Sequence, residues 1–346
     1  MLRFPKLGHL IHMPTHIDVL IGDYESCVRY NLAAIESDMM HVRVNPDSSG
    51  VSSFYFGYIV HNFHMLVYGC ILGGMEGIGL KTAFELNSHV NEDLFSSNPD
   101  LAPFIESYSA MEVHLLLRFG RWKEILQIPL PQDKELMLYR SVSIHYARAI
   151  AYAVTGDIAK AKLEADLFDK YAGHPSAKDR LLHNNTISRI FEADAPMMRG
   201  EIAYKEGKYE EAFSLLREAV TLQDSLKYDE PWGKMQPVRH ALGGLLLEQN
   251  QFNEAEIIFR TDLEKHPKNP WSTVGLINCL KKKYNVTDMC CSCKSSNGNK
   301  NVTPDVIAEL ELLQHQLIQQ RNCEWADFDI TQSCLCCKGN ENQILI

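Results

Sequence analysis

The stretch KEGKYEEAFSLLREAV, residues 205–220, carries the signals of two helices joined by a tight turn. Gly207 supplies the left-handed backbone position that ends one helix, and Tyr209 opens the next by packing back on the first. Ala212 and Leu216 then fall on one face, because residues four apart in a helix are neighbours. The stretch therefore predicts a helical hairpin.

The same phrase recurs along the chain with uneven spacing. It reads LIGDYESC around Gly22, RFGRWKEI around Gly120, AVTGDIAKA around Gly156, KEGKYEEA around Gly207 and EQNQFNEA around Asn250, with a weaker copy, GMEGIGLKT, at Gly77. The second helix of each full copy is expected to open at Tyr24, Trp122, Ile158, Tyr209 and Phe252. Sustained period-two alternation, the signal of strands, is nearly absent. The repeats predict an all-α fold, an α-solenoid of antiparallel helical hairpins.

Composition narrows the function classes. The chain has 346 residues, of which 45% are hydrophobic and 23% charged, as in folded soluble proteins. Lys plus Arg number 34 against 44 Asp plus Glu, so the net charge of −10 argues against a general nucleic-acid binder. The sequence shows neither a secretory signal nor a convincing transmembrane segment. We expect a cytoplasmic protein.

Several stretches resemble tetratricopeptide-repeat (TPR) proteins. The resemblance is closest to a widespread, functionally poorly characterised group with HMPTH- and HNFH-like motifs. It is carried by LGHLIHMPTHIDVLIGDY, HNFHMLVYGCILGGMEG, FGRWKEILQIPLP, HYARAIAYAVTGD and the long stretch that starts YDEPWGKMQPVRHALGG, within residues 7–276. It implies the fold but no established activity. Members usually carry further repeats upstream, so the chain looks N-terminally truncated, and an exposed apolar N-terminal face is expected around Leu2, Phe4, Leu7, Leu10 and Ile11.

Two pairs of histidines form the first candidate site. His12 and His16 are four residues apart, and His61 and His64 are three apart, so each pair can share a helical face. Two such pairs would suit a divalent transition metal, with Asp38 among the nearby carboxylates. Pro14 either kinks the first helix or begins a new one. The alternative is that these histidines pack on helix faces and donate to carbonyl or hydroxyl oxygens.

The stretch LKYDEPWGKMQPVRH forms a second candidate site. Its chemistry-bearing residues could line a concave groove and grip a ligand or peptide: Tyr228, Asp229, Glu230, Trp232 and Arg239. The alternative is a connecting loop in which Trp232 packs as a lid and Arg239 pairs with a carboxylate.

Cysteines concentrate near the C-terminus and suggest a domain boundary. Seven of the ten cysteines follow residue 289, so we expect a helical repeat domain over residues 1–281 and a Cys-rich, partly disordered extension over 282–346. An amphipathic helix is expected from Pro304 to Arg321. The pairs Cys290/Cys293 and Cys334/Cys337 offer a candidate four-thiolate zinc site. A reactive or lipidated cysteine cluster, or a tail without any ligand, remain alternatives.

Two functions follow from these features. The first is a cytosolic scaffold whose concave groove binds a peptide or protein partner. The second is a metal-dependent enzyme, an oxidoreductase or hydrolase, that uses the paired histidines.

Overall fold

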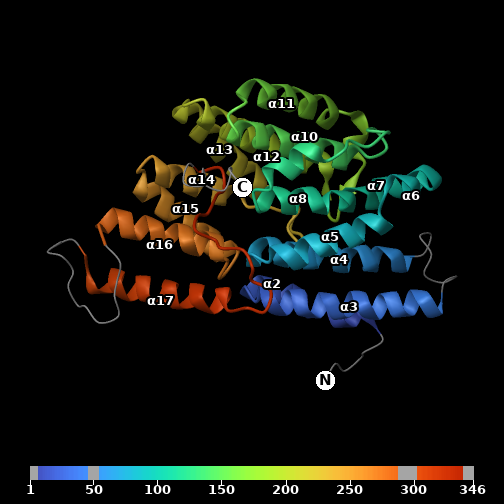
Figure 1. Ribbon diagram of the computed structural model, residues 1–346, viewed down its shortest axis with the longest axis horizontal. Coiled ribbons are helices and arrows are strands. Elements are labelled where there is room, and N and C mark those ends of the chain that lie inside the picture. Colours follow the sequence, from blue (N-terminus) through green and yellow to red (C-terminus); the bar gives the residue numbers. More distant parts are fainter. Residues whose placement is uncertain (1–6, 46–53, 287–301, 338–346) are drawn as a thin grey trace.

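The computed structural model describes residues 7–45, 54–286 and 302–337, and these are mostly helical (Figure 1). The strands within these residues form one short antiparallel hairpin, β1 (Leu181–Leu182) and β2 (Asn185–Thr186). The expectation of an all-α fold is confirmed. None of the helices in these ranges combines the length and the apolar character needed to cross a bilayer.

The first half of the chain forms a run of helices of very different lengths. In chain order they are α1 (Gly8–His12), α2 (Thr15–Ile21), α3 (Tyr24–Val44), α4 (Phe54–Gly73), α5 (Glu76–His89), α6 (Glu92–Ser97), the 3-10 helix η2 (Pro99–Leu101), α7 (Ala102–Ile105), the 3-10 helix η3 (Glu106–Ala110), α8 (Met111–Arg118) and α9 (Trp122–Gln127).

Longer helices dominate the second half. They are α10 (Leu138–Val154), α11 (Ile158–Ala172), the 3-10 helix η4 (Pro175–Lys178), α12 (Ile187–Lys205), α13 (Tyr209–Asp224), α14 (Val238–Glu248), α15 (Phe252–Lys265), α16 (Pro270–Tyr284) and α17 (Pro304–Arg321).

The recurring phrase produces the expected turns. The five residues expected in the left-handed conformation all have positive φ, between 58° and 93°: Gly22, Gly120, Gly156, Gly207 and Asn250. The helices that follow these turns, α3, α9, α11, α13 and α15, begin at the five expected residues. In the weak copy the turn lies at Gly74, which has φ of 75°, and not at the predicted Gly77. Gly77 lies in the first turn of α5.

Neighbouring helices pack in pairs, among them α3 with α4, α10 with α11, α12 with α13, and α14 with α15. Small residues permit close approach within these pairs. A Cβ atom at Gly200 of α12 would lie 2.8 Å from Leu216 Cγ of α13, and one at Gly243 of α14 would lie 2.5 Å from the ring of Phe259 of α15. The apolar faces of these pairs therefore merge into one continuous core.

Helices near the two ends of the described chain also meet. α16 packs against α4, although some two hundred residues separate them in the sequence. The Tyr24 hydroxyl at the start of α3 donates a hydrogen bond to the carbonyl of Pro267, which precedes α16, at 3.0 Å. The array of helices is thus closed by contacts between its early and late members (Figure 1).

The described part of the Cys-rich extension packs on the helical body. α17 has the expected bounds and contacts α16, with Leu310 and Leu313 buried. Residues 322–337, which we call the C-terminal segment, then cross from α17 toward the centre of the molecule (Figure 1). The Asp327 carboxylate accepts hydrogen bonds from the amides of Glu76 and Gly77 at 2.7 and 2.9 Å, which caps the N-terminus of α5.

An apolar face is exposed at the N-terminal helices, as expected. Leu7 and Leu10 are about half exposed, whereas Ile11 is buried, and Leu2 and Phe4 lie outside the described residues. The exposed face continues over α2, with Ile17 and Ile21.

Candidate functional site: a cluster of histidines

Three short stretches of chain bring histidines together. His12 is the last residue of α1, His16 lies in the first turn of α2, and His61 lies within α4. Of the two possibilities for Pro14, the structure has the new helix, with Pro14 preceding the first residue of α2. Met13 and Pro14 nevertheless keep right-handed helical backbone angles, so His12 and His16 still face each other across one turn.

The ring nitrogens of these histidines converge. Nε2 of His12 lies 2.9 Å from Nε2 of His16. The centroid of the His61 ring lies 4.6 Å from that of His12 and 5.6 Å from that of His16. One nitrogen of each ring lies within 4.8 Å of those of the other two. Three imidazole nitrogens at this separation match the ligand set of zinc and neighbouring divalent transition ions.

The opposite ring nitrogens of His12 and His16 are held by neighbours. Nδ1 of His12 donates to Oδ1 of Asn31 at 2.7 Å. The Asn31 amide donates to Thr15 Oγ1 and to the carbonyl of Cys27, which fixes which side of the amide faces the histidine. Oε2 of Glu230 lies 2.7 Å from Nδ1 of His16 and favours a proton there. These partners direct both Nε2 lone pairs toward each other, and two facing lone pairs repel unless a cation lies between them.

Either a proton or a metal ion can be the cation between the two lone pairs, and burial of the histidines disfavours the proton. It lowers the pKa of His12 to about 4, and the neighbouring His16 lowers it further. Burial also places the pKa of His61 well below its ordinary value. At neutral pH these imidazoles are therefore uncharged and hold lone pairs available to a metal, whereas a shared proton is disfavoured.

His183 adds a further imidazole beside the other three. It occupies the turn of the β1–β2 hairpin with φ of 57°, and its ring stacks on that of His61 with centroids 4.5 Å apart. Its Nδ1 lies 2.6 Å from Oδ1 of Asp229. The other carboxylate oxygen of Asp229 accepts from the Asn184 amide at 3.0 Å, which fixes the turn. We call His12, His16, His61 and His183 the histidine cluster.

Solvent reaches part of the histidine cluster. The side chains of His16, Glu230 and His183 are 16%, 25% and 29% exposed, whereas His12 is fully buried. A metal held by the Nε2 atoms of His12 and His16 would therefore lie near solvent, with Glu230 behind His16 at the opposite ring nitrogen. Three protein ligands and one open position are typical of catalytic rather than structural zinc sites.

Two residues predicted for this site lie elsewhere. His64 is fully buried, and its Nε2 lies 3.2 Å from the sulfur of Met235 rather than toward the other three histidines. Asp38 accepts hydrogen bonds from the Tyr55 hydroxyl at 2.6 Å and from the Asn62 amide at 2.7 Å. Both of its oxygens are thus used to join α3 to α4.

The five residues predicted to line a groove divide between two places. Asp229 and Glu230 hold His183 and His16, so the two sites predicted separately meet in space. Trp232 and Arg239 instead line a small cavity of about 50 Å³, where Arg239 pairs with Asp224. Tyr228 is exposed and directs its hydroxyl to Glu230.

The cysteine pairs cannot be joined into one site within the described chain. Cys290 and Cys293 lie outside the described residues. Cys334 and Cys337 are buried, and both contact α14 at Gly244.

The sequence pattern does not single out Asn31, His183 or Glu201. Asn31 sits mid-helix with no distinctive spacing. His183 had a usable signal, because the run HNNT, residues 183–186, is rich in turn-forming residues within an otherwise helical pattern. Glu201 lies on α12 near the buried cysteines and is described below. Comparison of the chain with protein-family models and with curated proteins finds no match in either set.

Proposed function

We propose that the chain is a TPR-like α-solenoid that acts as a metal-dependent hydrolase, with a divalent transition ion of the zinc class held by the histidine cluster. The solenoid assignment rests on the regular helix–turn–helix units and on the resemblance of the sequence to TPR proteins. The hydrolase assignment rests on the cluster geometry. Its main support is the 2.9 Å approach of two Nε2 atoms whose opposite nitrogens are both held by neighbours.

The chemistry follows from the ligand set and its exposure. A zinc-class ion with one open position lowers the pKa of a bound water to near neutrality and so supplies a nucleophile. Glu230 contacts Nδ1 of His16 and would keep its Nε2 available to such an ion. His183, next to His61 and hydrogen-bonded to Asp229, is a partly exposed group that would be able to exchange a proton beside the site.

Metal titration of the full-length protein tests the metal site. To remove the thiol ligands of the C-terminal segment and of the CCSC stretch, the titration uses a background with serine at Cys334, Cys336, Cys337, Cys290, Cys291 and Cys293. We expect about one equivalent of Zn²⁺ by calorimetry, and its loss in His61→Gln. His315→Gln, at an exposed position of α17, is the matched control and should bind as the background does. Equal zinc binding by His61→Gln and its background would refute the site.

Hydrolytic activity is tested separately with simple chromogenic esters and phosphoesters. We expect slow turnover that a chelator abolishes, that Zn²⁺ or Co²⁺ restores and that His61→Gln lacks. Metal binding without turnover of any probe would keep the metal site and reject the hydrolase.

A second candidate function, binding of a peptide from a partner protein, is supported by the C-terminal segment. Non-helical residues of this segment lie against glycines of the helical body: Ile330 against Gly74, Leu335 against Gly120 and Cys334 against Gly244. A surface of the helical body that binds a non-helical segment of its own chain is suited to bind an extended peptide of another protein.

A synthetic peptide of residues 322–337 is the probe for this second function. We expect it to bind an Ile330→Asp/Leu335→Asp variant, whose own segment is loosened, more tightly than the unaltered chain. A peptide that carries the same two substitutions is the control and should not bind. Equal affinity for both proteins would argue against a peptide-binding surface beneath the segment.

A further inference from the structure

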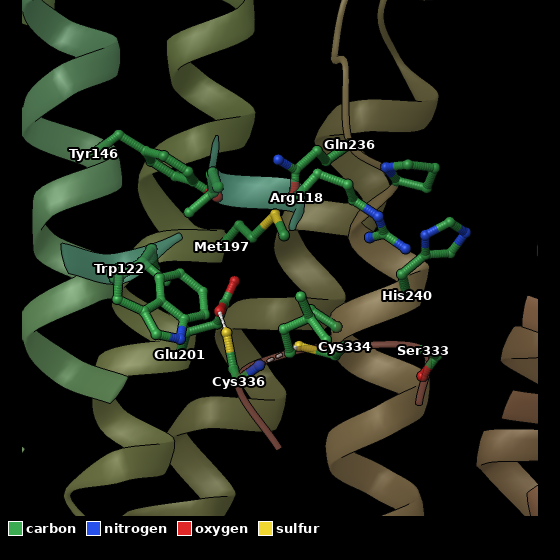
Figure 2. A pocket seen from close by; sticks show the side chains of 15 residues that line it. Arg118, Trp122, Tyr146, Met197, Glu201, Gln236, His240, Ser333, Cys334 and Cys336 are labelled. Atoms are coloured by element: carbon green, nitrogen blue, oxygen red, sulfur yellow. Dashed lines mark hydrogen bonds between the residues drawn. The ribbon is translucent and has the colours of Figure 1, made fainter. Parts of the chain in front are cut away.

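A cluster of thiols lies where the C-terminal segment meets α12. Cys336 donates a hydrogen bond from Sγ to a carboxylate oxygen of Glu201, and the Cys336 amide lies 3.3 Å from Sγ of Cys334 (Figure 2). Glu201, Cys334 and Cys336 are all buried. One ligand atom of each lies within 4.8 Å of those of the other two.

The helical body is shaped to receive these residues. A Cβ atom at Gly244 of α14 would lie 2.8 Å from Ser333 Oγ, 3.1 Å from Cys334 Cβ and 3.2 Å from Cys337 Sγ. A larger residue at that position would push the segment away from α14. Cys337, whose thiol contacts that of Cys334, brings a third sulfur to the same place.

A cavity of about 30 Å³ adjoins the thiols. Its polar lining includes Arg118, Glu201, His240, Cys334 and Cys336 (Figure 2). This volume exceeds the roughly 10–15 Å³ that one water requires. Arg118 is 6% exposed, its guanidinium lies 3.3 Å above the Trp271 ring, and its Nε and Nη2 have no hydrogen-bond partner among the described residues.

The charges of these groups match a dipositive ion. Two thiolates and one carboxylate carry three negative charges, and a divalent ion together with Arg118 carries three positive ones. The resulting assembly is neutral, and a neutral assembly is far less costly to bury than the separate charges. Thiolate ligands select zinc-like and softer ions over magnesium and calcium.

We propose that Glu201, Cys334 and Cys336 bind a thiophilic divalent ion of the zinc class, with Cys337 as the nearest further ligand. Two ligands belong to the C-terminal segment and one belongs to α12, so the ion clamps the segment onto the helical body. The site forms only while the segment is seated. It is independent of the histidine cluster.

Cadmium titration of the full-length, reduced and metal-free protein tests this site, because cadmium–thiolate bonds absorb in the ultraviolet. We expect stoichiometric absorption from this site in the unaltered protein and in His61→Gln. It should disappear in Cys334→Ser/Cys336→Ser. Two controls should retain it: Cys323→Ser, and the triple serine variant at Cys290, Cys291 and Cys293, which lie outside the described residues. Unchanged absorption in Cys334→Ser/Cys336→Ser, or its loss in the triple variant, would overturn the assignment.

Glu201→Gln provides a milder second variant, because glutamine keeps the size of the side chain and can still contact Cys336. We expect cadmium affinity to fall by about tenfold or more, since a charged ligand becomes neutral. Hydrogen exchange of residues 322–337 should slow on addition of Zn²⁺ in the unaltered protein but not in Cys334→Ser/Cys336→Ser. Exchange that is indifferent to Zn²⁺ in the unaltered protein would show that no ion clamps the segment.

Discussion

Nε1 of Trp271 donates a hydrogen bond to the carbonyl oxygen of Ile71 at 2.9 Å, which joins α16 to α4. Ile71 lies in the last turn of α4, where carbonyl groups have no partner within the helix. The indole is fully buried and therefore both caps α4 and fills the space between helices that are remote in sequence.

Trp271→Phe should destabilise the protein by about 2–4 kcal/mol, because it leaves a buried carbonyl unpaired and removes ring volume. Urea unfolding followed by circular dichroism measures the loss. Trp325→Phe, at a partly exposed position of the C-terminal segment, is the control and should change stability little. Similar losses in the two variants would contradict a special role for the bond to Ile71.

Glu230→Gln should weaken Zn²⁺ binding at the histidine cluster by about tenfold to a hundredfold. The carboxylate is 2.7 Å from Nδ1 of His16 and makes the opposite nitrogen a better donor. Calorimetry in the serine background of the metal titration measures the change, with the exposed Glu264→Gln as control. An unchanged dissociation constant would show that Glu230 does not support the metal ligand.

Gly8→Ala should displace α1 and cost about 1–3 kcal/mol of stability. A Cβ atom at Gly8 would lie 1.9 Å from Oδ1 of Asp38, and Asp38 is itself held by Tyr55 and Asn62. Because α1 carries His12, zinc affinity should fall as well. Gly57→Ala in α4, where a Cβ meets no atom within 4 Å, is the control and should leave both properties intact. Thermal unfolding of both variants measures the change in stability, and zinc titration measures the change in zinc affinity.

Stability should fall in mild acid partly because of His266. Burial lowers its pKa to about 4 from 6.5, although nearby Asp262 opposes the shift; His240, Arg239 and Lys265 lower it further. Between these values the unfolded chain binds a proton that the folded protein does not. The contribution of His266 is thus complete above pH 6.5 and is lost as the pH falls toward 4.

At pH 5 this loss amounts to about 2 kcal/mol relative to pH 7.5. Unfolding free energies at the two pH values should therefore differ less in His266→Gln than in the unaltered protein, and His315→Gln should keep the full difference. Identical pH dependence in all three proteins would rule out His266 as a contributor.

The sequence was most informative where local rules decide the structure. A left-handed glycine followed by an aromatic or branched residue marks a helix boundary through the backbone alone, and the helices that start at Tyr24 and Tyr209 confirm it. The pairing of His12 with His16 was also predictable, because one helical turn relates them. Neither inference needs knowledge of the tertiary fold.

Contacts between residues remote in sequence determine which candidate residues reach the histidine cluster, and the sequence pattern does not predict these contacts. Sequence spacing does not distinguish His61 from His64 as a metal ligand. In the structure, His61 of α4 faces His12 of α1, whereas His64 faces Met235. Asp38 is a suitable ligand by chemistry, yet Gly8 leaves room for it to bind Tyr55 and Asn62 instead. Glu230 contacts His16 although the two are remote in sequence, and local sequence rules do not predict such a contact.

The contact between α4 and α16 also limits how such a protein can change in length during evolution. In an open repeat array each unit touches only its neighbours, so whole units can be gained or lost with little effect on the rest. Here an added hairpin between α5 and α15 would carry α16 away from α4 and leave the Trp271 indole without Ile71. Duplication of one unit would therefore break the closure, and the number of hairpins between these two helices is set by geometry.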